Sequence, residues 1–188
     1  MSYGTLSLEQ SEKLRPFLKD QRVYDLGAGD LRLSKTLLHL GAVHVVAVEK
    51  EADLRPTLTM RYSEGVGVRV PNVPEEITYL RTTFRDFREQ APLVFVSWPV
   101  NWVTGIQQVL AKAETVIYLG KNTDGISCGD SGIWNHLASR EVLVHLPESQ
   151  NTLIVYGRGR VVRRYLPEER VALDHDRIWS FEEHLQEV

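Results

Sequence analysis

The sequence lacks most of the features that mark exported, disulfide-stabilised or membrane-embedded proteins. It contains one cysteine, Cys128, which excludes an internal disulfide and suits a reducing compartment. No segment approaches the roughly 20 apolar residues that a membrane span requires. Met1 is followed by polar residues rather than by a basic segment and an apolar run, so no signal peptide is predicted. We therefore expect a cytoplasmic protein that does not bind membranes.

An excess of either charge is also lacking. The 22 lysines and arginines nearly balance the 25 aspartates and glutamates, leaving a net charge of −3. Such a balance gives no global attraction toward nucleic acid, although a local basic stretch leaves nucleic acid possible as a partner: Arg158, Arg160, Arg163 and Arg164. The six histidines and the single cysteine show no metal-ligand spacing, so no metal site is expected.

The composition of the rest is ordinary for a globular protein. The chain is 188 residues long, with 43% hydrophobic and 25% charged residues, which is close to the average for globular proteins. Neither an internal repeat nor a low-complexity segment interrupts it. This length supports one core, and we expect a single domain over residues 1–188. The oligomeric state is left open by the sequence.

The most informative segment lies near the N-terminus and reads Val23-Tyr-Asp-Leu-Gly-Ala-Gly-Asp-Leu31. It predicts a buried strand that ends in a sharp turn, where Gly27 and Gly29 let the backbone reverse and approach a ligand closely. A helix over 31–40 and a second apolar strand over 44–48 follow. Glu49 then lies twenty residues after Gly29, the spacing at which a nucleotide-binding βαβ unit places a carboxylate on a ribose.

Hydrophobic patterning predicts alternating strands and helices along the remaining chain. We expect strands over 22–26, 44–48, 77–82, 93–97 and 115–119, and helices over 7–19, 31–40, 104–113 and 130–139. His136 is predicted to be an ordinary exposed residue of the last helix. Residues 51–74, with several glycines and prolines, predict a short helix and then irregular chain. Two final strands, over 141–146 and 152–156, are joined by too few residues for a crossover, so they should pair antiparallel.

This pattern resembles the class I S-adenosylmethionine-dependent methyltransferase family over residues 23–156. Asp25-Leu-Gly-Ala-Gly29 is similar to the nucleotide turn of that family, although Leu31 stands where many members have a third glycine. The resemblance implies a Rossmann-like three-layer α/β sandwich with a mostly parallel seven-stranded sheet and a C-terminal antiparallel hairpin. It also implies S-adenosyl-L-methionine as cofactor, with these binding residues: Asp25, Gly27, Ala28, Gly29, Glu49, Lys50, Asp86, Phe87 and Ser97.

In that family Asp25 would hold the methionine portion of the cofactor, Glu49 the ribose hydroxyls, and Asp86 with Phe87 the adenine. Asp86 could equally cap a helix. Glu49, judged without its spacing, could be a surface residue at a strand end.

The segment Ser97-Trp-Pro-Val-Asn-Trp102 after the fourth predicted strand resembles, loosely, the signature of amino-group methyltransferases. The resemblance implies that Ser97, Trp98, Pro99 and Trp102 form the catalytic wall beside the transferable methyl group. Trp98 departs from the signature at its first proline. Packing of both tryptophans against the next helix explains them equally well. The long glycine-containing loop from Gly120 to Gly132 would lie opposite this wall as a lid or gate.

The methyl acceptor is unidentified: a small molecule, a nucleobase or a protein side chain. Two close tryptophans favour a small or planar acceptor.

Two alternatives stay open beside a methyltransferase. A nicotinamide-dependent oxidoreductase would also have an acid twenty residues after the turn, but its fingerprint requires glycine where Arg32 stands. A non-catalytic module that binds only the cofactor or a partner would explain the incomplete signature after the fourth strand.

Overall fold

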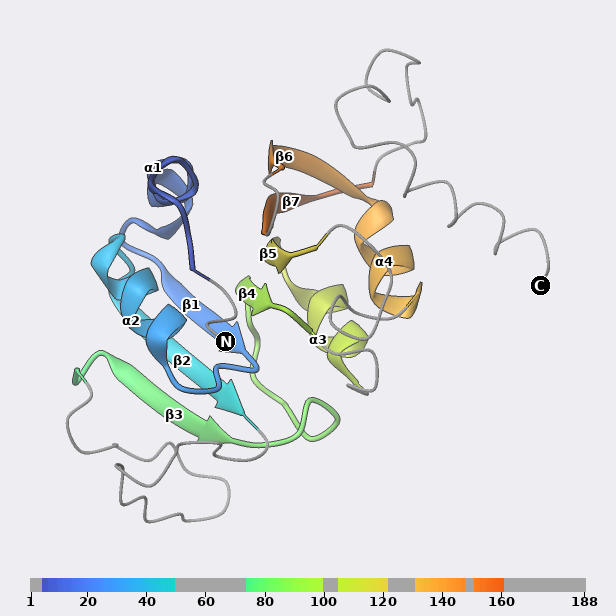
Figure 1. The fold of residues 1–188 in the computed structure, drawn as a ribbon. Helices are drawn as coiled ribbons and strands as arrows, with labels where there is room; N and C mark the ends of the chain where they lie inside the picture. The colour runs from blue at the N-terminus through green and yellow to red at the C-terminus, as the bar shows by residue number, and fades with distance from the viewer. Residues whose placement is uncertain (1–4, 50–73, 100–104, 122–130, 148–150, 161–188) are drawn as a thin grey trace, which may run out of the picture.

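A computed structural model describes residues 5–49, 74–99, 105–121, 131–147 and 151–160 of the chain. Within these ranges seven strands form one sheet (Figure 1). They are β1 (Arg22–Leu26), β2 (His44–Glu49), β3 (Ile77–Arg81), β4 (Leu93–Ser97), β5 (Thr115–Gly120), β6 (Arg140–Leu146) and β7 (Thr152–Arg160). The described helices are α1 (Leu8–Leu18), α2 (Arg32–His39), α3 (Ile106–Lys112) and α4 (Ser131–Ala138).

The order of strands across the sheet is β3-β2-β1-β4-β5-β7-β6. The first five strands pair in parallel, and β7 pairs antiparallel with both β5 and β6. Strand order reverses at β1, which lies between β2 and β4. In open α/β sheets ligands bind outside the carboxyl ends of the strands at such a reversal, so the topology points to the ends of β1, β2 and β4.

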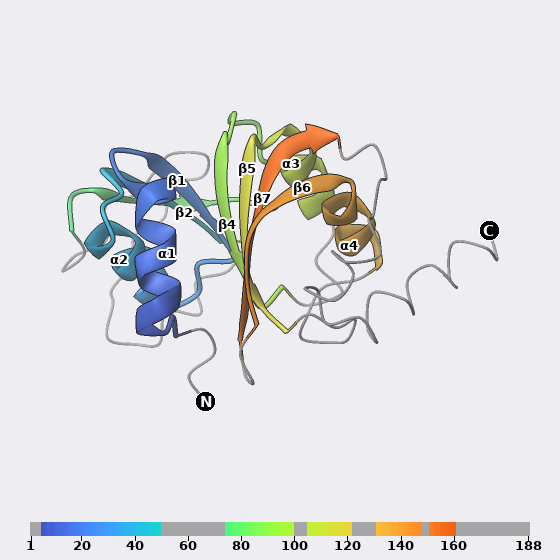
Figure 2. The same cartoon turned by 90° about the horizontal axis from the view of Figure 1, so that it is seen from above.

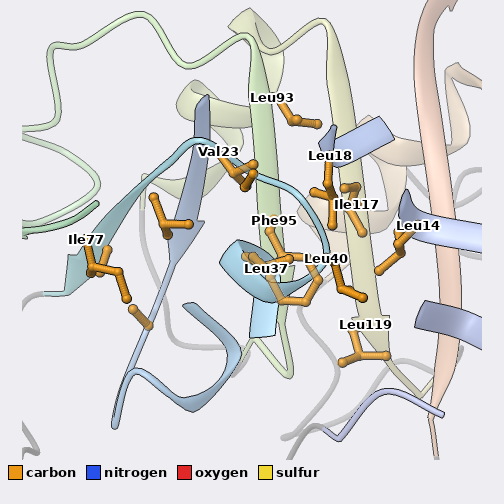
Figure 3. Packing of buried hydrophobic residues seen from close by; sticks show 14 of the residues in the cluster. Leu14, Leu18, Val23, Leu37, Leu40, Ile77, Leu93, Phe95, Ile117 and Leu119 are labelled. Carbon is orange, nitrogen blue, oxygen red and sulfur yellow. The ribbon is translucent and has the colours of Figure 1, made fainter. Parts of the chain in front are cut away.

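The sheet is buried on both faces by helices, and each face has its own core. Figure 2 shows α1 and α2 on one side of the sheet and α3 and α4 on the other. Side chains from α1 and α2, such as Leu14 and Leu37, pack on Phe95 and Ile117 of the central strands in the first core (Figure 3). Ile106 of α3 belongs to the second core. This is the three-layer arrangement that the sequence predicts.

The predicted bounds agree closely with the observed ones. The first and fourth strands match residue for residue, and the other described elements end within a few positions of their predicted limits. The antiparallel pairing of the last two strands is confirmed. Residues 51–73 of the segment predicted as a short helix and irregular chain lie outside the described residues. None of the helices in the described ranges has the length and apolarity needed to cross a membrane.

The terminal hairpin is fastened to the body of the fold by Arg140 at the start of β6. This guanidinium is buried and donates to the carbonyls of Leu110 and Ala113 at the end of α3, at 2.6 and 2.7 Å. It also donates to the carbonyl of Gly157 in β7, at 3.2 Å. One side chain thus joins α3 to both strands of the hairpin.

The prediction that His136 is exposed is wrong. His136 of α4 is half-buried, and its Nε2 is shielded from solvent with no hydrogen-bond partner among the described residues. Burial lowers the pKa of this imidazole below its usual value. The sequence pattern missed this because α4 packs on α3 in an orientation that its own residues do not reveal.

Gly105 allows the start of α3 to lie against the connection between β3 and β4. It precedes α3 with a φ of 91°, and a Cβ placed there would lie 2.8 Å from the backbone nitrogen of Arg85. Arg85 belongs to the connection between β3 and β4, which carries Asp86 and Phe87. The start of α3 therefore touches that connection backbone to backbone, and only glycine fits both the dihedral angle and the contact.

We expect Gly105→Ala to destabilise the protein more than Gly41→Ala does. Gly41 also has a positive φ, of 117°, but a Cβ there meets Lys19 at an ordinary 3.5 Å. Both variants bear the left-handed strain of about 1–2 kcal/mol, and only Gly105→Ala adds an overpacking cost of about 1–3 kcal/mol. Denaturant unfolding measures both. Equal losses would show that the Gly105–Arg85 contact relaxes without cost.

Candidate functional site

The turn between β1 and α2 is tightly wound. Gly27, Gly29 and Leu31 have φ values of 76°, 52° and 63°, all in the left-handed region. The amides of Gly27 and Ala28 donate to the carbonyl of Val48 in β2, at 2.8 and 3.3 Å. The turn after β1 is thus bonded to the carboxyl end of β2, and its backbone faces the edge at which the strand order reverses.

Asp25 lies beneath this turn and is completely buried. One carboxyl oxygen accepts a hydrogen bond from the Ser34 hydroxyl of α2 at 2.5 Å, while Oδ1 has no hydrogen-bond partner among the described residues. Burial raises the pKa of Asp25 to about 7, although the Ser34 bond opposes the rise; the nearby carboxylate of Glu49 adds to it. A buried carboxyl with one unsatisfied oxygen costs stability, and this makes Asp25 a candidate binding residue.

Glu49 closes the other side of the turn. Its Oε2 accepts a hydrogen bond from the Gly29 amide at 3.3 Å, and its side chain is half-exposed. The carboxylates of Asp25 and Glu49 therefore flank one glycine turn, as the twenty-residue spacing predicts. Glu49 also helps to hold the turn itself, a structural role that the spacing does not indicate.

No described residue lies close in front of the turn. A Cβ placed on Gly27 would meet no heavy atom of the described residues within 4 Å, and one placed on Gly29 would meet only the carbonyl oxygen of Gly27, at 3.9 Å. Packing against the described residues therefore does not require glycine at either position. Because Gly27 and Gly29 have no side chains, their backbone offers a surface that a ligand could cover.

Asp86 and Phe87 lie in the connection between β3 and β4 but differ in burial. Phe87 is buried in the second core, where its ring packs edge-on against Tyr24 with centroids 5.8 Å apart. Asp86 is exposed; its carboxylate accepts from the Thr83 hydroxyl at 2.5 Å and its amide donates to the Thr83 oxygen at 3.2 Å. Asp86 thus stabilises a local turn, and whether it also contacts adenine stays a prediction.

The end of β4 has partly buried residues and one strained backbone position. Ser97 and Trp98 are half-buried and Pro99 is buried. Trp98 has a φ of 46°, which is rare for a bulky residue, and its amide donates to the carbonyl of Leu119 in β5 at 2.8 Å. Lys50, Trp102 and residues 122–130 of the predicted lid lie outside the described residues.

One residue at this edge was not predicted. Asn151, immediately before β7, accepts a hydrogen bond from the indole Nε1 of Trp98 at 2.8 Å. An asparagine in a short link between two strands carries no motif, and only the antiparallel course of β7 brings it to Trp98. Within the described residues, no group of three or more His, Cys, Asp or Glu side chains is arranged to hold a metal ion.

Comparisons with known proteins support the fold. The sequence matches no family model and no curated protein. By structure it is similar to an S-adenosylmethionine dependent methyltransferase from Mesorhizobium loti, with 11% identity over 78% of this chain and 96% of that one, at a TM-score of 0.52. A ribosomal protein L11 methylase from Lactobacillus delbrueckii subsp. bulgaricus is 17% identical over 84% and 81% of the two chains, at 0.53.

A third similar structure is a protein in the NADB-Rossmann superfamily from Streptococcus agalactiae, 15% identical over 98% and 83% of the two chains, at a TM-score of 0.52. The chain therefore has the Rossmann-like fold of class I methyltransferases, with a seven-stranded sheet and a C-terminal antiparallel hairpin.

The raised pKa of Asp25 predicts a distinctive dependence of stability on pH. The folded protein holds this proton up to a pKa of about 7, whereas an unfolded aspartate loses it near pH 3.9. The contribution of Asp25 to stability is thus fully present below about pH 4 and is lost as the pH rises through about 7.

Between these two pH values, each unit by which the pH rises lowers the free energy of unfolding by up to about 1.4 kcal/mol. Asp25→Asn keeps an acceptor for Ser34 and should abolish this slope, whereas Asp30→Asn, at an exposed carboxylate, should retain it. Denaturant unfolding between about pH 5 and 7 measures the slopes. Parallel curves for wild type and Asp25→Asn would mean that Asp25 is ionised in the folded protein.

Proposed function

We propose that the protein is a methyltransferase that uses S-adenosyl-L-methionine and transfers its methyl group to an acceptor not yet identified. The observation that carries this proposal is the glycine turn after β1, which the carboxylates of Asp25 and Glu49 flank and which no described residue covers within 4 Å of Gly27. It lies at the reversal of strand order, in the fold shared with class I methyltransferases.

The residues at the turn fit such a cofactor. The backbone around Gly27 and Gly29 offers space without side chains, and the unsatisfied Oδ1 of Asp25 offers a buried acceptor for the ammonium of a methionine moiety. Glu49 stands at the end of β2, where its carboxylate could accept from ribose hydroxyls. Asp86 at the next connection would receive the adenine amino group. Lys50 and Ser97 would complete the set that the resemblance implies.

When bound, the cofactor would supply a methyl group already activated on a sulfonium. The protein then needs to align an acceptor with that methyl group and exclude water, because holding two reactants in line supplies much of a rate enhancement. Ser97, Trp98, Pro99 and Trp102 are proposed as the acceptor wall. A half-buried tryptophan there favours a small or planar acceptor, since flat rings stack favourably on aromatic faces.

The sheet also argues against a nicotinamide-dependent oxidoreductase. The dinucleotide-binding fold has a strand order of 3-2-1-4-5-6 with parallel strands, whereas here β7 is inserted antiparallel between β5 and β6. Arg32 also occupies the position where the dinucleotide fingerprint requires glycine.

Cofactor identity can be tested by ligand binding. S-adenosylhomocysteine should raise the melting temperature and bind in calorimetry, because a ligand that binds only the folded state stabilises it. NADH should do neither. Stabilisation by NADH alone would overturn the proposal. Binding of S-adenosylhomocysteine without transfer of labelled methyl to any fraction of a cell extract would favour a non-catalytic binding module.

We expect Glu49→Ala to weaken S-adenosylhomocysteine binding about 10- to 100-fold, because hydrogen bonds to a charged group contribute about 1.5–3 kcal/mol. The melting temperature should fall only slightly, since the Glu49 side chain is half-exposed and its bond to the Gly29 amide is long, at 3.3 Å. Calorimetry measures the affinity.

Asp30→Ala is the matched control, because it removes an exposed carboxylate from the same turn, one that pairs with Arg32. Its affinity should stay within about threefold of wild type. A folded Glu49→Ala protein with wild-type affinity would show that the ribose is held elsewhere.

A further inference from the structure

Trp98 is held in an unusual conformation from two sides. Its left-handed φ of 46° is rare for a bulky side chain, and such outliers persist only where the surroundings enforce them. The backbone is held by the bond from its amide to the Leu119 carbonyl of β5. The side chain is held by the bond from the indole Nε1 to Oδ1 of Asn151, at 2.8 Å.

Asn151 is itself fixed by the N-terminal part of the chain. Its side-chain Nδ2 donates to the carbonyl of Thr5 at 3.3 Å, and its backbone carbonyl accepts from Nε2 of Gln10 at 3.0 Å. Gln10 is completely buried, and its Oε1 accepts from the Ser7 amide at 3.1 Å, at the start of α1. A continuous set of hydrogen bonds therefore runs from the cap of α1 through Asn151 to the indole.

The sheet register places this contact away from the glycine turn. Ser97 pairs with Leu119, and Gly120 at the end of β5 pairs with Thr152, the residue after Asn151. The indole nitrogen is therefore bonded on the β7 side of β4, whereas the turn after β1 lies on the other side of β4. Trp98 is fixed toward the half of the edge that Asp25 and Glu49 do not occupy.

We propose that Asn151 is a positioning residue for the acceptor site, holding the indole of Trp98 where a planar acceptor stacks. The proposal rests on the proposed function, because it assigns the acceptor to the β4–β5–β7 half of the edge. It also gives Thr5, just before α1, and Gln10, in the first turn of α1, a supporting role, since both hold Asn151 in place. Asn151 acts through Trp98 and does not contact the reacting atoms.

Two variants separate positioning from packing. Asn151→Leu has the same branched shape, although a larger volume, and its side chain offers no acceptor to the indole. Asn151→Asp keeps an oxygen for Trp98 Nε1 but replaces the donor to the Thr5 carbonyl with a second, charged oxygen. Spectra of ¹⁵N-labelled protein identify the Trp98 indole signal by its loss in Trp98→Phe. We expect hydrogen exchange at this indole to be slow in wild type and in Asn151→Asp, and at least tenfold faster in Asn151→Leu.

The functional test uses S-adenosylhomocysteine for binding, and radiolabelled S-adenosylmethionine with fractions of a cell extract for methyl transfer. Affinity for S-adenosylhomocysteine should stay within twofold in both variants, because neither touches the turn after β1. At saturating cofactor, we expect Asn151→Leu to transfer labelled methyl at least tenfold more slowly than wild type does, to the same fraction. Asn151→Asp should stay within about threefold of wild type, a rescue that loss of packing alone would not produce.

Unchanged labelling in Asn151→Leu, with indole protection lost, would overturn the proposal and leave Asn151 a purely structural link. Unchanged indole protection in Asn151→Leu would overturn it at the first step. If Asn151→Leu does not fold, Asn151→Ser replaces it, because its hydroxyl is too short to reach the indole. The same two results, for indole exchange and for methyl transfer, then decide the proposal. Failure of wild type to bind S-adenosylhomocysteine would instead count against the proposed function, and the indole exchange would still report on the Trp98–Asn151 bond.

Discussion

The candidate site depends on how the chain reverses after β1. Three residues of that turn have left-handed backbones, and one of them is Leu31, for which this conformation is unfavourable. The reversal is held by backbone bonds to Val48, by the Glu49 carboxylate on the Gly29 amide, and by Asp25 with Ser34 below it. The first two sets of bonds join the turn to β2, and the third joins β1 to α2, so the shape of the turn depends on both neighbouring elements.

The electrostatics of this turn are unfavourable for the protein alone. Asp25 is completely buried near another carboxylate, and no basic side chain of the described residues pairs with it. Its single hydrogen bond leaves one oxygen without a partner. Natural proteins retain such groups mainly where they serve binding or catalysis. A cationic ligand group near Asp25 would favour the ionised form, so cofactor binding and proton release would be coupled.

The terminal hairpin contributes to the same edge for a topological reason. Parallel strands place their carboxyl ends there, but β7 runs in the opposite direction, so its beginning lies there instead. Asn151 therefore reaches Trp98 although the two are far apart in sequence. Arg140 joins one end of the hairpin to α3, and Gln10 joins the other end of the hairpin, at Asn151, to α1. The edge is divided into a half near the glycine turn and a half near β7.

Local pattern determined the elements of this protein and the identity of the glycine turn. Apolar runs bounded by glycine and polar residues predict strands such as Arg22–Leu26, because burial on both faces requires continuous hydrophobicity. The spacing from Gly29 to Glu49 predicts their meeting, since one βαβ unit has a nearly constant length.

Contacts between distant segments were decided only by the tertiary structure. The partial burial of His136, the clamp formed by Arg140 and the bond between Asn151 and Trp98 all depend on how helices and a reversed strand pack. No local pattern encodes them, because a side chain's partners across the sheet are set by register and packing rather than by its neighbours in sequence.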